Sequence, residues 1–187
     1  LLDKEELENF LKFKLGFKNL LVTFHPVTLE NTTSELQMKE LLKALSELKD
    51  TKLIFTLPNS DTDSRIIIKL IKEFSSNNFN AYFFESLGQL RYLSCIQHVD
   101  GVVGNSSSGL LEVPSFKKGT INIGDRQLGR IQADSVINCK PNYNSISSAI
   151  EQLYSKNFQS SLRGVVNPYG SGGASEKVVE VIREYPL

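Results

Sequence analysis

Short apolar runs alternate with longer amphipathic stretches along this chain. The runs at residues 20–24 and 52–57 are rich in branched and aromatic residues and end at a His-Pro or Pro-Asn turn. Alternation of this kind is typical of βα repeats that build a parallel sheet covered by helices. We expect strands at residues 20–24, 52–57, 80–84, 101–103, 120–123 and 135–138.

The amphipathic stretches between these runs predict helices. Thr32 and Glu35 fit a capping box, and apolar residues follow at helical spacing as far as Leu48. Residues 1–6 have the pattern of a helix already under way. The whole pattern predicts one α/β domain over residues 1–187, a Rossmann-like three-layer fold around a parallel sheet. Further helices are expected at residues 64–74, 87–97, 110–113, 146–154 and 176–184.

The composition supports an ordinary globular domain and argues against several classes of function. Of the 187 residues, 40% are hydrophobic and 22% are charged, which suits a single folded core. The formal net charge is zero and no stretch is strongly basic, so we expect no nucleic-acid partner. No apolar run approaches the roughly 20 residues that span a bilayer, so we expect no membrane partner. We also find no signal-peptide pattern.

The two cysteines, Cys95 and Cys139, lie far apart in the sequence. Neither belongs to a CxxC motif or to a Cys/His set with the spacing of zinc ligands. We therefore expect no metal and no cofactor. Reduced, partly buried thiols in a cytoplasmic protein explain both residues.

Polar residues follow the predicted strands at the edge where open α/β sheets bind ligands. They include His25, Asn59, Glu85 and Arg126. The run Gly-Asn-Ser-Ser-Ser-Gly at residues 104–109 leads from the fourth strand directly into a short helix. Its glycines permit a tight turn, and amides and hydroxyls at a helix N-terminus suit an anion such as a diphosphate. Simple N-capping by serine explains the same residues, so both interpretations stay open.

Three further side chains are candidates for the same site, each with a structural alternative. Glu112, one turn into the short helix, could accept hydrogen bonds from a ribose diol or face solvent. His25 could contact a phosphate, act as an acid or base, or be structural. Arg126 suits a phosphate, or a surface ion pair with Asp125 or another neighbour. The second histidine, His98, is predicted to cap the C-terminus of its helix.

Several stretches together resemble the hydrolysing UDP-N-acetylglucosamine 2-epimerases of sialic-acid-type sugar biosynthesis. The joint occurrence of the run at 104–109 and of Gly-Asp-Arg-Gln at 124–127 is the most specific part of the match. The lysines at 117 and 118 and the glycine-rich stretch 171–173 depart from the family pattern. The matching stretches occur in family order and cover most of the chain: residues 23–28, 57–59, 102–112 with 114–116, 121–130, and 167–170 with 174–176.

The resemblance implies a glycosyltransferase-B arrangement of two Rossmann-like domains with the active site in the cleft between them. This chain would be the C-terminal, UDP-binding half, and the N-terminal catalytic domain would be absent from it. Within this half, Ser106 and Ser107 would hold the diphosphate and Glu112 the ribose hydroxyls.

Four more residues receive roles from the same resemblance. His25, as a catalytic residue, and Arg126 would face the phosphates and the sugar. Asn59 would lie near the nucleotide, and Tyr92 would stack against the uracil. We also expect a UDP-sugar as the partner and a homo-oligomeric full-length enzyme.

The implied reaction abstracts the proton at C2 of the sugar and expels UDP to give a glycal. Water then adds to the glycal, so UDP-N-acetylglucosamine yields N-acetylmannosamine and UDP. The family's acid/base carboxylates lie mainly in the N-terminal domain, so we expect this chain to bind UDP weakly without turning over. The sugar is left open between N-acetylglucosamine and a diacetylated bacillosamine-type sugar.

Three other functions fit parts of the sequence. A glycosyltransferase-B donor-binding domain would share the glycine turn and Glu112, and is less expected to carry Gly-Asp-Arg-Gln. A non-catalytic nucleotide-sugar-binding module is disfavoured by the many polar residues at strand ends. A non-hydrolysing epimerase is disfavoured by the pair His25-Pro26 and by the triple serine.

Overall fold

A parallel sheet forms the centre of the molecule. The computed structural model describes residues 1–27, 31–58 and 64–185, and within them the strand order is β3-β2-β1-β4-β5-β6. Every neighbouring pair is parallel, so all carboxyl ends lie at one edge. The predicted strands are confirmed, with ends shifted by no more than two residues. They are β1 (Lys18–Thr23), β2 (Thr51–Thr56), β3 (Ala81–Phe84), β4 (Gly101–Gly104), β5 (Gly119–Ile123) and β6 (Val136–Cys139).

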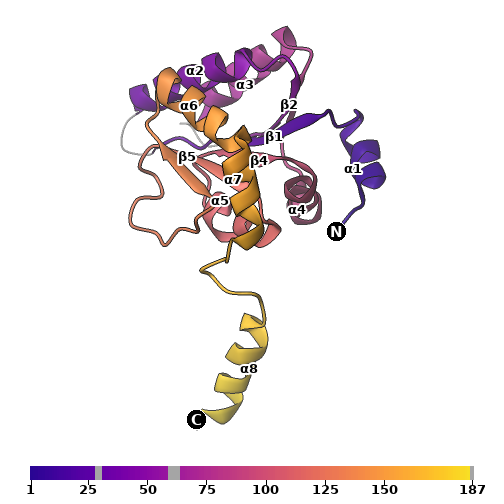
Figure 1. The fold of residues 1–187 in the computed structure, drawn as a ribbon, viewed down its shortest axis with the longest axis vertical. Coiled ribbons are helices and arrows are strands. Elements are labelled where there is room, and N and C mark those ends of the chain that lie inside the picture. The colour runs from indigo at the N-terminus through magenta and orange to yellow at the C-terminus, as the bar shows by residue number, and fades with distance from the viewer. Residues whose placement is uncertain (28–30, 59–63, 186–187) are drawn as a thin grey trace.

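Helices cover both faces of the sheet, which gives the three layers that the sequence predicts (Figure 1). Leu20 and Val22 of β1 pack toward one set of helices, and Leu21 packs toward the other, because successive strand residues face opposite sides. One face carries α2 (Asn31–Ser46), α3 (Ser64–Asn77) and α6 (Tyr143–Tyr154), and the other α1 (Lys4–Leu11), α4 (Gly88–His98) and the 3-10 helix η1 (Val113–Phe116).

The beginning of the chain differs from the prediction. Residues 1–6 are not the continuation of a helix, because α1 begins at Lys4 with Asp3 as its N-cap. The Asp3 carboxylate accepts from the Glu6 amide at 2.9 Å, and the Glu6 carboxylate accepts from the Asp3 amide at 3.0 Å. This reciprocal pair satisfies two backbone donors that a helix start leaves open.

Other helix ends also correct or extend the prediction. His98 ends α4, but its Nε2 atom pairs with the Leu2 carbonyl oxygen at 3.2 Å, and the Val99 amide caps the helix. The capping box expected at Thr32 lies outside the described side chains. Two short helices have too weak a periodicity to be predicted: α7 (Lys156–Ser161) and the 3-10 helix η2 (Leu162–Gly164).

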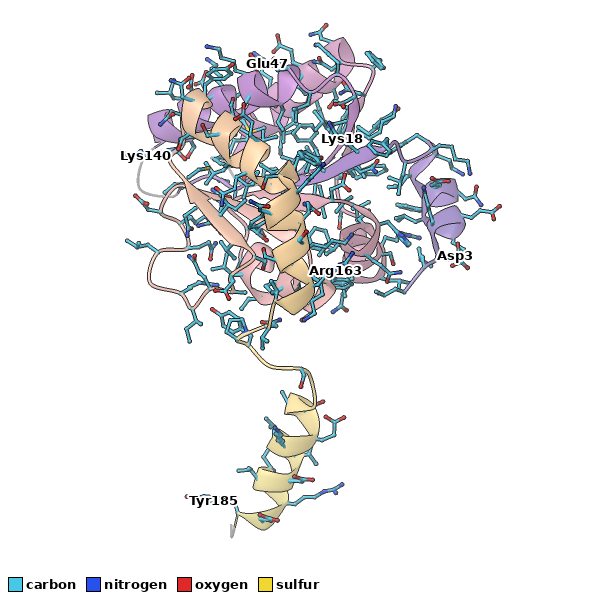
Figure 2. The ribbon with its side chains drawn as sticks, viewed as in Figure 1. Asp3, Lys18, Glu47, Lys140, Arg163 and Tyr185 are labelled. Atoms are coloured by element: carbon cyan, nitrogen blue, oxygen red, sulfur yellow. The ribbon has the colours of Figure 1, made fainter. Side chains whose placement is uncertain are left out.

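The predicted last helix is present as α8 (Ala174–Glu184), which projects away from the sheet (Figures 1 and 2). All of its residues are exposed, including the apolar Val178, Val181 and Ile182. Figure 2 shows Tyr185 at the far end of this helix. Within the described residues, no helix has both the length and the apolar character needed to cross a bilayer.

Candidate functional site

The carboxyl ends of β1 and β4 meet at the centre of the sheet. Thr23, at the end of β1, pairs with Gly104, at the end of β4. The sheet continues from β1 through β2 and β3 in one direction, and from β4 through β5 and β6 in the other. Loops that leave such neighbouring strands turn to opposite faces and open a crevice, which is where open α/β sheets bind ligands. The candidate site lies at this crevice.

Gly104 lets the two strand ends approach closely. Its φ is +143°, a value that L side chains rarely adopt. A Cβ atom placed there would lie 1.9 Å from the Thr23 carbonyl oxygen. The same oxygen accepts a hydrogen bond from the Asn105 amide at 3.2 Å. Only glycine permits this approach, so the first glycine of the 104–109 run serves the joint between the strands.

Asn105 ties the loop after β4 to the loop after β1. Its side chain is fully buried. Its Oδ1 atom accepts from the His25 amide at 2.7 Å, and its Nδ2 atom donates to the His25 carbonyl oxygen at 2.8 Å. These two bonds fix the backbone of His25 beside the serine run, so the half-buried His25 has a defined place at the end of β1.

The loop after β5 reaches the same residue. Arg126 Nη1 donates to the Asn105 carbonyl oxygen at 3.1 Å, and Gln127 Nε2 donates to it at 2.8 Å. The alternative of an ion pair with Asp125 does not occur among the described residues. Partial burial, followed by the charge of Arg130, lowers the pKa of Arg126. An arginine stays protonated under such a shift, so a cation lies beside the serine run.

The serine run turns into a helix that is as short as the sequence predicts but begins two residues earlier. α5 comprises only Ser108–Leu111, and Ser107 at its N-cap makes no side-chain capping bond. The Ser107 side chain therefore does not cap the helix. Ser106 Oγ accepts a long hydrogen bond from the Ser108 amide at 3.4 Å. Glu112 is not one turn inside the helix, because it caps the C-terminus of α5 and precedes η1.

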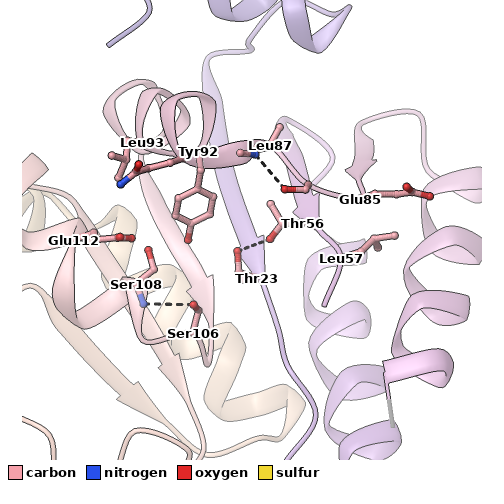
Figure 3. A pocket seen from close by; sticks show the side chains of 13 residues that line it. Thr23, Thr56, Leu57, Glu85, Leu87, Tyr92, Leu93, Ser106, Ser108 and Glu112 are labelled. Carbon is pink, nitrogen blue, oxygen red and sulfur yellow. Dashed lines mark hydrogen bonds between the residues drawn. The ribbon is translucent and has the colours of Figure 1, made fainter. Parts of the chain in front are cut away.

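A pocket of about 420 Å³ opens between the serine run and the N-terminal half of α4 (Figure 3). Three of the residues proposed from the resemblance line it together: Ser106, Glu112 and Tyr92. In Figure 3 the Glu112 carboxylate points toward the Tyr92 side of the pocket. Lining residues without a proposed role come from the ends of β1 and β2, from the segment after β3, from α4 and from α5: Thr23, Thr56, Leu57, Glu85, Ser86, Leu87, Gly88, Gln89, Leu93 and Ser108.

Hydroxyl groups form the inner wall of this pocket. Thr23 Oγ1 and Thr56 Oγ1 lie 2.7 Å apart in a hydrogen bond. The Tyr92 and Ser108 hydroxyls are buried, and neither has a hydrogen-bond partner of normal geometry among the described residues. Burial raises the pKa of Tyr92, and the nearby Ser108 and Thr23 hydroxyls offset this only in part. Tyr92 is therefore a neutral donor that a polar ligand group can satisfy.

The other predicted site residues lie outside the pocket lining. His25 and Arg126 are each hydrogen-bonded to Asn105, which directly precedes Ser106 in the chain, and Ser107 lies at the N-cap of α5. Asn59 lies outside the described residues. Asn105 itself received no role from the sequence, because its partner His25 is 80 positions away and no local pattern predicts the contact.

A larger hollow, of about 950 Å³, lies at the carboxyl ends of β5 and β6. Its amides bind one another: Asn122 Nδ2 donates to Asn138 Oδ1 at 2.8 Å, and Asn138 Nδ2 donates to Gln132 Oε1 at 2.7 Å. Size alone would favour this hollow. The smaller pocket is the better candidate because it lies where the strand order reverses and gathers the residues singled out from the sequence.

Comparison with known proteins assigns the chain to a family. The family described as UDP-N-acetylglucosamine 2-epimerase matches residues 2–183. The chain belongs to this family. The expected resemblance is thus confirmed at the level of the family.

Two curated relatives of this epimerase chain are similar over most of its length. It is 39% identical over 159 residues to the GDP/UDP-N,N'-diacetylbacillosamine 2-epimerase (hydrolyzing) of Campylobacter jejuni, which covers 84% of this chain and 41% of that protein. It is 40% identical over 188 residues to polysialic acid biosynthesis protein P7 of Escherichia coli, covering 98% of this chain and 46% of that protein. The chain spans somewhat less than half the length of these relatives.

A solved structure confirms the Rossmann-like fold. The UDP-GlcNAc 2-epimerase of Neisseria meningitidis, solved with UDP-GlcNAc bound, superposes with a TM-score of 0.71 at 19% identity. The match covers 97% of this chain and 48% of that one. At this identity the likeness establishes the fold, and the roles of individual residues rest on the site itself.

Proposed function

We propose that this chain is the UDP-binding half of a hydrolysing UDP-N-acetylglucosamine 2-epimerase. The observation that carries the proposal is that Ser106, Tyr92 and Glu112 line one pocket where the strand order reverses. The hydrolysing branch is supported by the printed name of the Campylobacter jejuni relative and by that of a second relative, from Legionella pneumophila, which is 29% identical.

In this proposal, different residues of the pocket bind different parts of a UDP molecule. Glu112 accepts hydrogen bonds from the two ribose hydroxyls, because a carboxylate offers two oxygens that both accept. The aromatic ring of Tyr92 lies against the uracil. Ser106 and the amides of the serine run, including that of Ser107, bind the diphosphate, whose charge favours backbone donors at this turn.

The reaction requires the loss of UDP from C1 of the sugar. A base removes the proton from C2, the C1–O bond breaks with its electron pair leaving on UDP, and a glycal remains. Water then adds across the double bond to give N-acetylmannosamine. The positive charge of Arg126, together with His25 and the amides, stabilises the negative charge that develops on the leaving diphosphate.

Proton abstraction belongs to a second domain in this proposal. The relatives are more than twice as long as the part that they share with this chain. The acidic groups that line the pocket are Glu85 and Glu112, and the proposal assigns Glu112 to the ribose rather than to proton transfer. The account therefore assigns the base to an N-terminal domain, in a homo-oligomeric cytoplasmic enzyme.

Binding of UDP to this chain tests the proposal. Calorimetry should detect UDP binding at millimolar concentration or below. Glu112→Ala should weaken it about tenfold or more, because a hydrogen bond to a charged group contributes about 1.5–3 kcal/mol. Ser106→Ala should weaken it by a smaller factor of about five.

A comparison of UDP with 2′-deoxy-UDP separates the contribution of the ribose hydroxyls to binding from that of the rest of the nucleotide. The Glu112 variant should lose the preference for UDP over 2′-deoxy-UDP, and the Ser106 variant should keep it. If the chain does not bind UDP, or if neither substitution weakens binding, the proposed function is wrong. Transfer of a sugar from UDP to an acceptor by the complete enzyme would instead indicate a glycosyltransferase.

A further inference from the structure

Asn105 is the point at which three loops of the site are joined. Its amide donates to Thr23 at the end of β1, and its side chain makes two bonds with the backbone of His25. Its carbonyl oxygen accepts from both Arg126 and Gln127 in the loop after β5. These are five hydrogen bonds to one residue whose exposed fraction is 0%.

The side-chain contact demands an amide. The His25 amide needs an acceptor and the His25 carbonyl oxygen needs a donor, and Asn105 supplies both from one planar group. A carboxylate would place lone pairs against the carbonyl oxygen, and an apolar side chain would satisfy neither group. The residue is fully buried, so water cannot replace the lost bonds without a rearrangement.

Asn105 holds other residues of the site in place, although it does not itself contact the pocket. It does not line the pocket of Ser106 and Glu112. His25, which precedes the loop after β1, and Arg126, which carries a charge, are both bonded to it. Ser106 follows it directly in the chain. A shift of this one residue would therefore move three groups assigned to the phosphate end of the ligand.

We propose that Asn105 is a positioning residue of the UDP site, one that holds His25, Ser106 and Arg126 in the arrangement that binds the diphosphate. The inference rests on the proposed function for the identity of the ligand. It predicts that loss of the Asn105 side-chain amide weakens binding of the phosphates. Binding of the nucleoside should stay nearly unchanged, because Tyr92 and Glu112 are held by other elements.

The test compares UDP with uridine in NMR titrations of the wild-type chain and of Asn105→Leu. The variant keeps a side chain of similar size without its polar atoms. UDP affinity should fall about tenfold, the effect of roughly 1.4 kcal/mol, whereas uridine affinity should change less than about twofold. A role confined to folding would lower both affinities equally or lower neither, and either result overturns the proposal.

Asn80 offers a matched control at the opposite edge of the sheet. It is 95% buried, and its Nδ2 atom donates to the carbonyl oxygens of Leu48 and Thr51, both at 2.7 Å. Asn80→Leu should reduce thermal stability as Asn105→Leu does, but leave the ratio of UDP to uridine affinity at the wild-type value. An equal change of that ratio in both variants would show a general loss of structure and would contradict the proposal.

A second variant keeps the test open if Asn105→Leu does not fold. Gln127→Met removes the donor to the Asn105 carbonyl oxygen, and the Oε1 atom of Gln127 already lacks a partner among the described residues. It should weaken UDP binding selectively, by about threefold. Unchanged UDP affinity in this variant would contradict the inference.

A measurement without ligand separates this inference from the proposed function. In the free chain, Asn105→Leu should shift the NMR signals of His25 and of the Arg126 guanidinium more than Asn80→Leu does. If these shifts occur but the wild-type chain does not bind UDP, the proposed function is wrong and the positioning role of Asn105 stands. Unshifted signals would overturn the positioning role, whatever the ligand.

Discussion

Ser106, Tyr92 and Glu112 reach one pocket from two segments of the chain that are separated by β4. Tyr92 is carried by α4, and the other two flank the four-residue α5. Their convergence depends on the joint between β1 and β4 rather than on contacts between their own side chains. The local sequence determines each side chain's chemistry, and the joint determines where that chemistry is presented.

The buried thiols provide a residue-scale prediction about pH. Burial raises the pKa of Cys95 to about 12 and that of Cys139 to about 11. An unfolded thiol titrates near about 8.5, so above that pH the unfolded chain releases protons that the folded chain retains. The free energy of unfolding should therefore be unaffected below about pH 8.5 and fall as pH rises toward 12.

The check is urea unfolding of the wild-type chain and of Cys95→Ala at pH 7.5 and pH 10. The wild type should lose about 2 kcal/mol more than the variant between these two pH values, since each pH unit in the window costs about 1.4 kcal/mol for one thiol. Tyrosines and lysines titrate in both proteins and cancel in the comparison. The same loss in both proteins would contradict the assigned burial of the Cys95 thiol.

At the scale of elements, Gly104 forms the joint on which the site depends. An alanine at this position places Cβ against the Thr23 carbonyl oxygen at a positive φ. Gly104→Ala should therefore lower the free energy of unfolding by at least about 2 kcal/mol. Gly88 also has a positive φ, but no atom lies within 4 Å of a Cβ placed there. Gly88→Ala should therefore lower the free energy of unfolding by only about 1 kcal/mol. Urea unfolding measures both, and equal losses would show that the clash is relieved elsewhere.

The elements themselves could be predicted from the sequence, because buried parallel strands are apolar throughout and end at recognisable turns. β1 and β5 are buried along nearly their whole length, and both were expected. The beginning of α1 and the short α7 could not be predicted, because a few polar residues carry little periodicity. Glu112 was placed inside a helix because the length of α5 depends on how Pro114 is accommodated in η1.

The candidate site was predictable in its parts and not in its construction. The run after the fourth strand pointed to Ser106 and Glu112, and the family resemblance added Tyr92; the structure brings the three together. The bonds of Asn105 with His25 and Arg126 join loops distant in sequence, and only the folded chain shows them. No local pattern in the serine run predicts that the Ser108 hydroxyl is buried in the pocket wall.

At the scale of the whole molecule, the chain presents surface that it does not cover. Val178, Val181 and Ile182 of α8 are each more than half exposed, and the helix stands away from the sheet (Figure 2). The relatives continue for more than the length of this chain. Both observations support the proposed two-domain enzyme, in which this half holds the leaving group.

A direct consequence concerns turnover. The 187-residue chain incubated with UDP-N-acetylglucosamine should release no UDP above the uncatalysed rate, because the proposed function assigns the abstraction of the C2 proton to the other domain. An assay for free UDP, calibrated with added UDP in the presence of the chain, measures this. Sustained release of UDP would show that the acid/base groups lie within this chain and that the two-domain account is wrong.

The location of the nucleotide is the central claim, and an NMR titration of the isotope-labelled chain with UDP tests it most directly. The account predicts that UDP shifts the amide signals of Thr23, Tyr92, Ser106 and Ser108. The signals of Asn138 and Lys140, which line the larger hollow, should stay in place. Shifts confined to the larger hollow, or no shifts at millimolar UDP, would contradict the account.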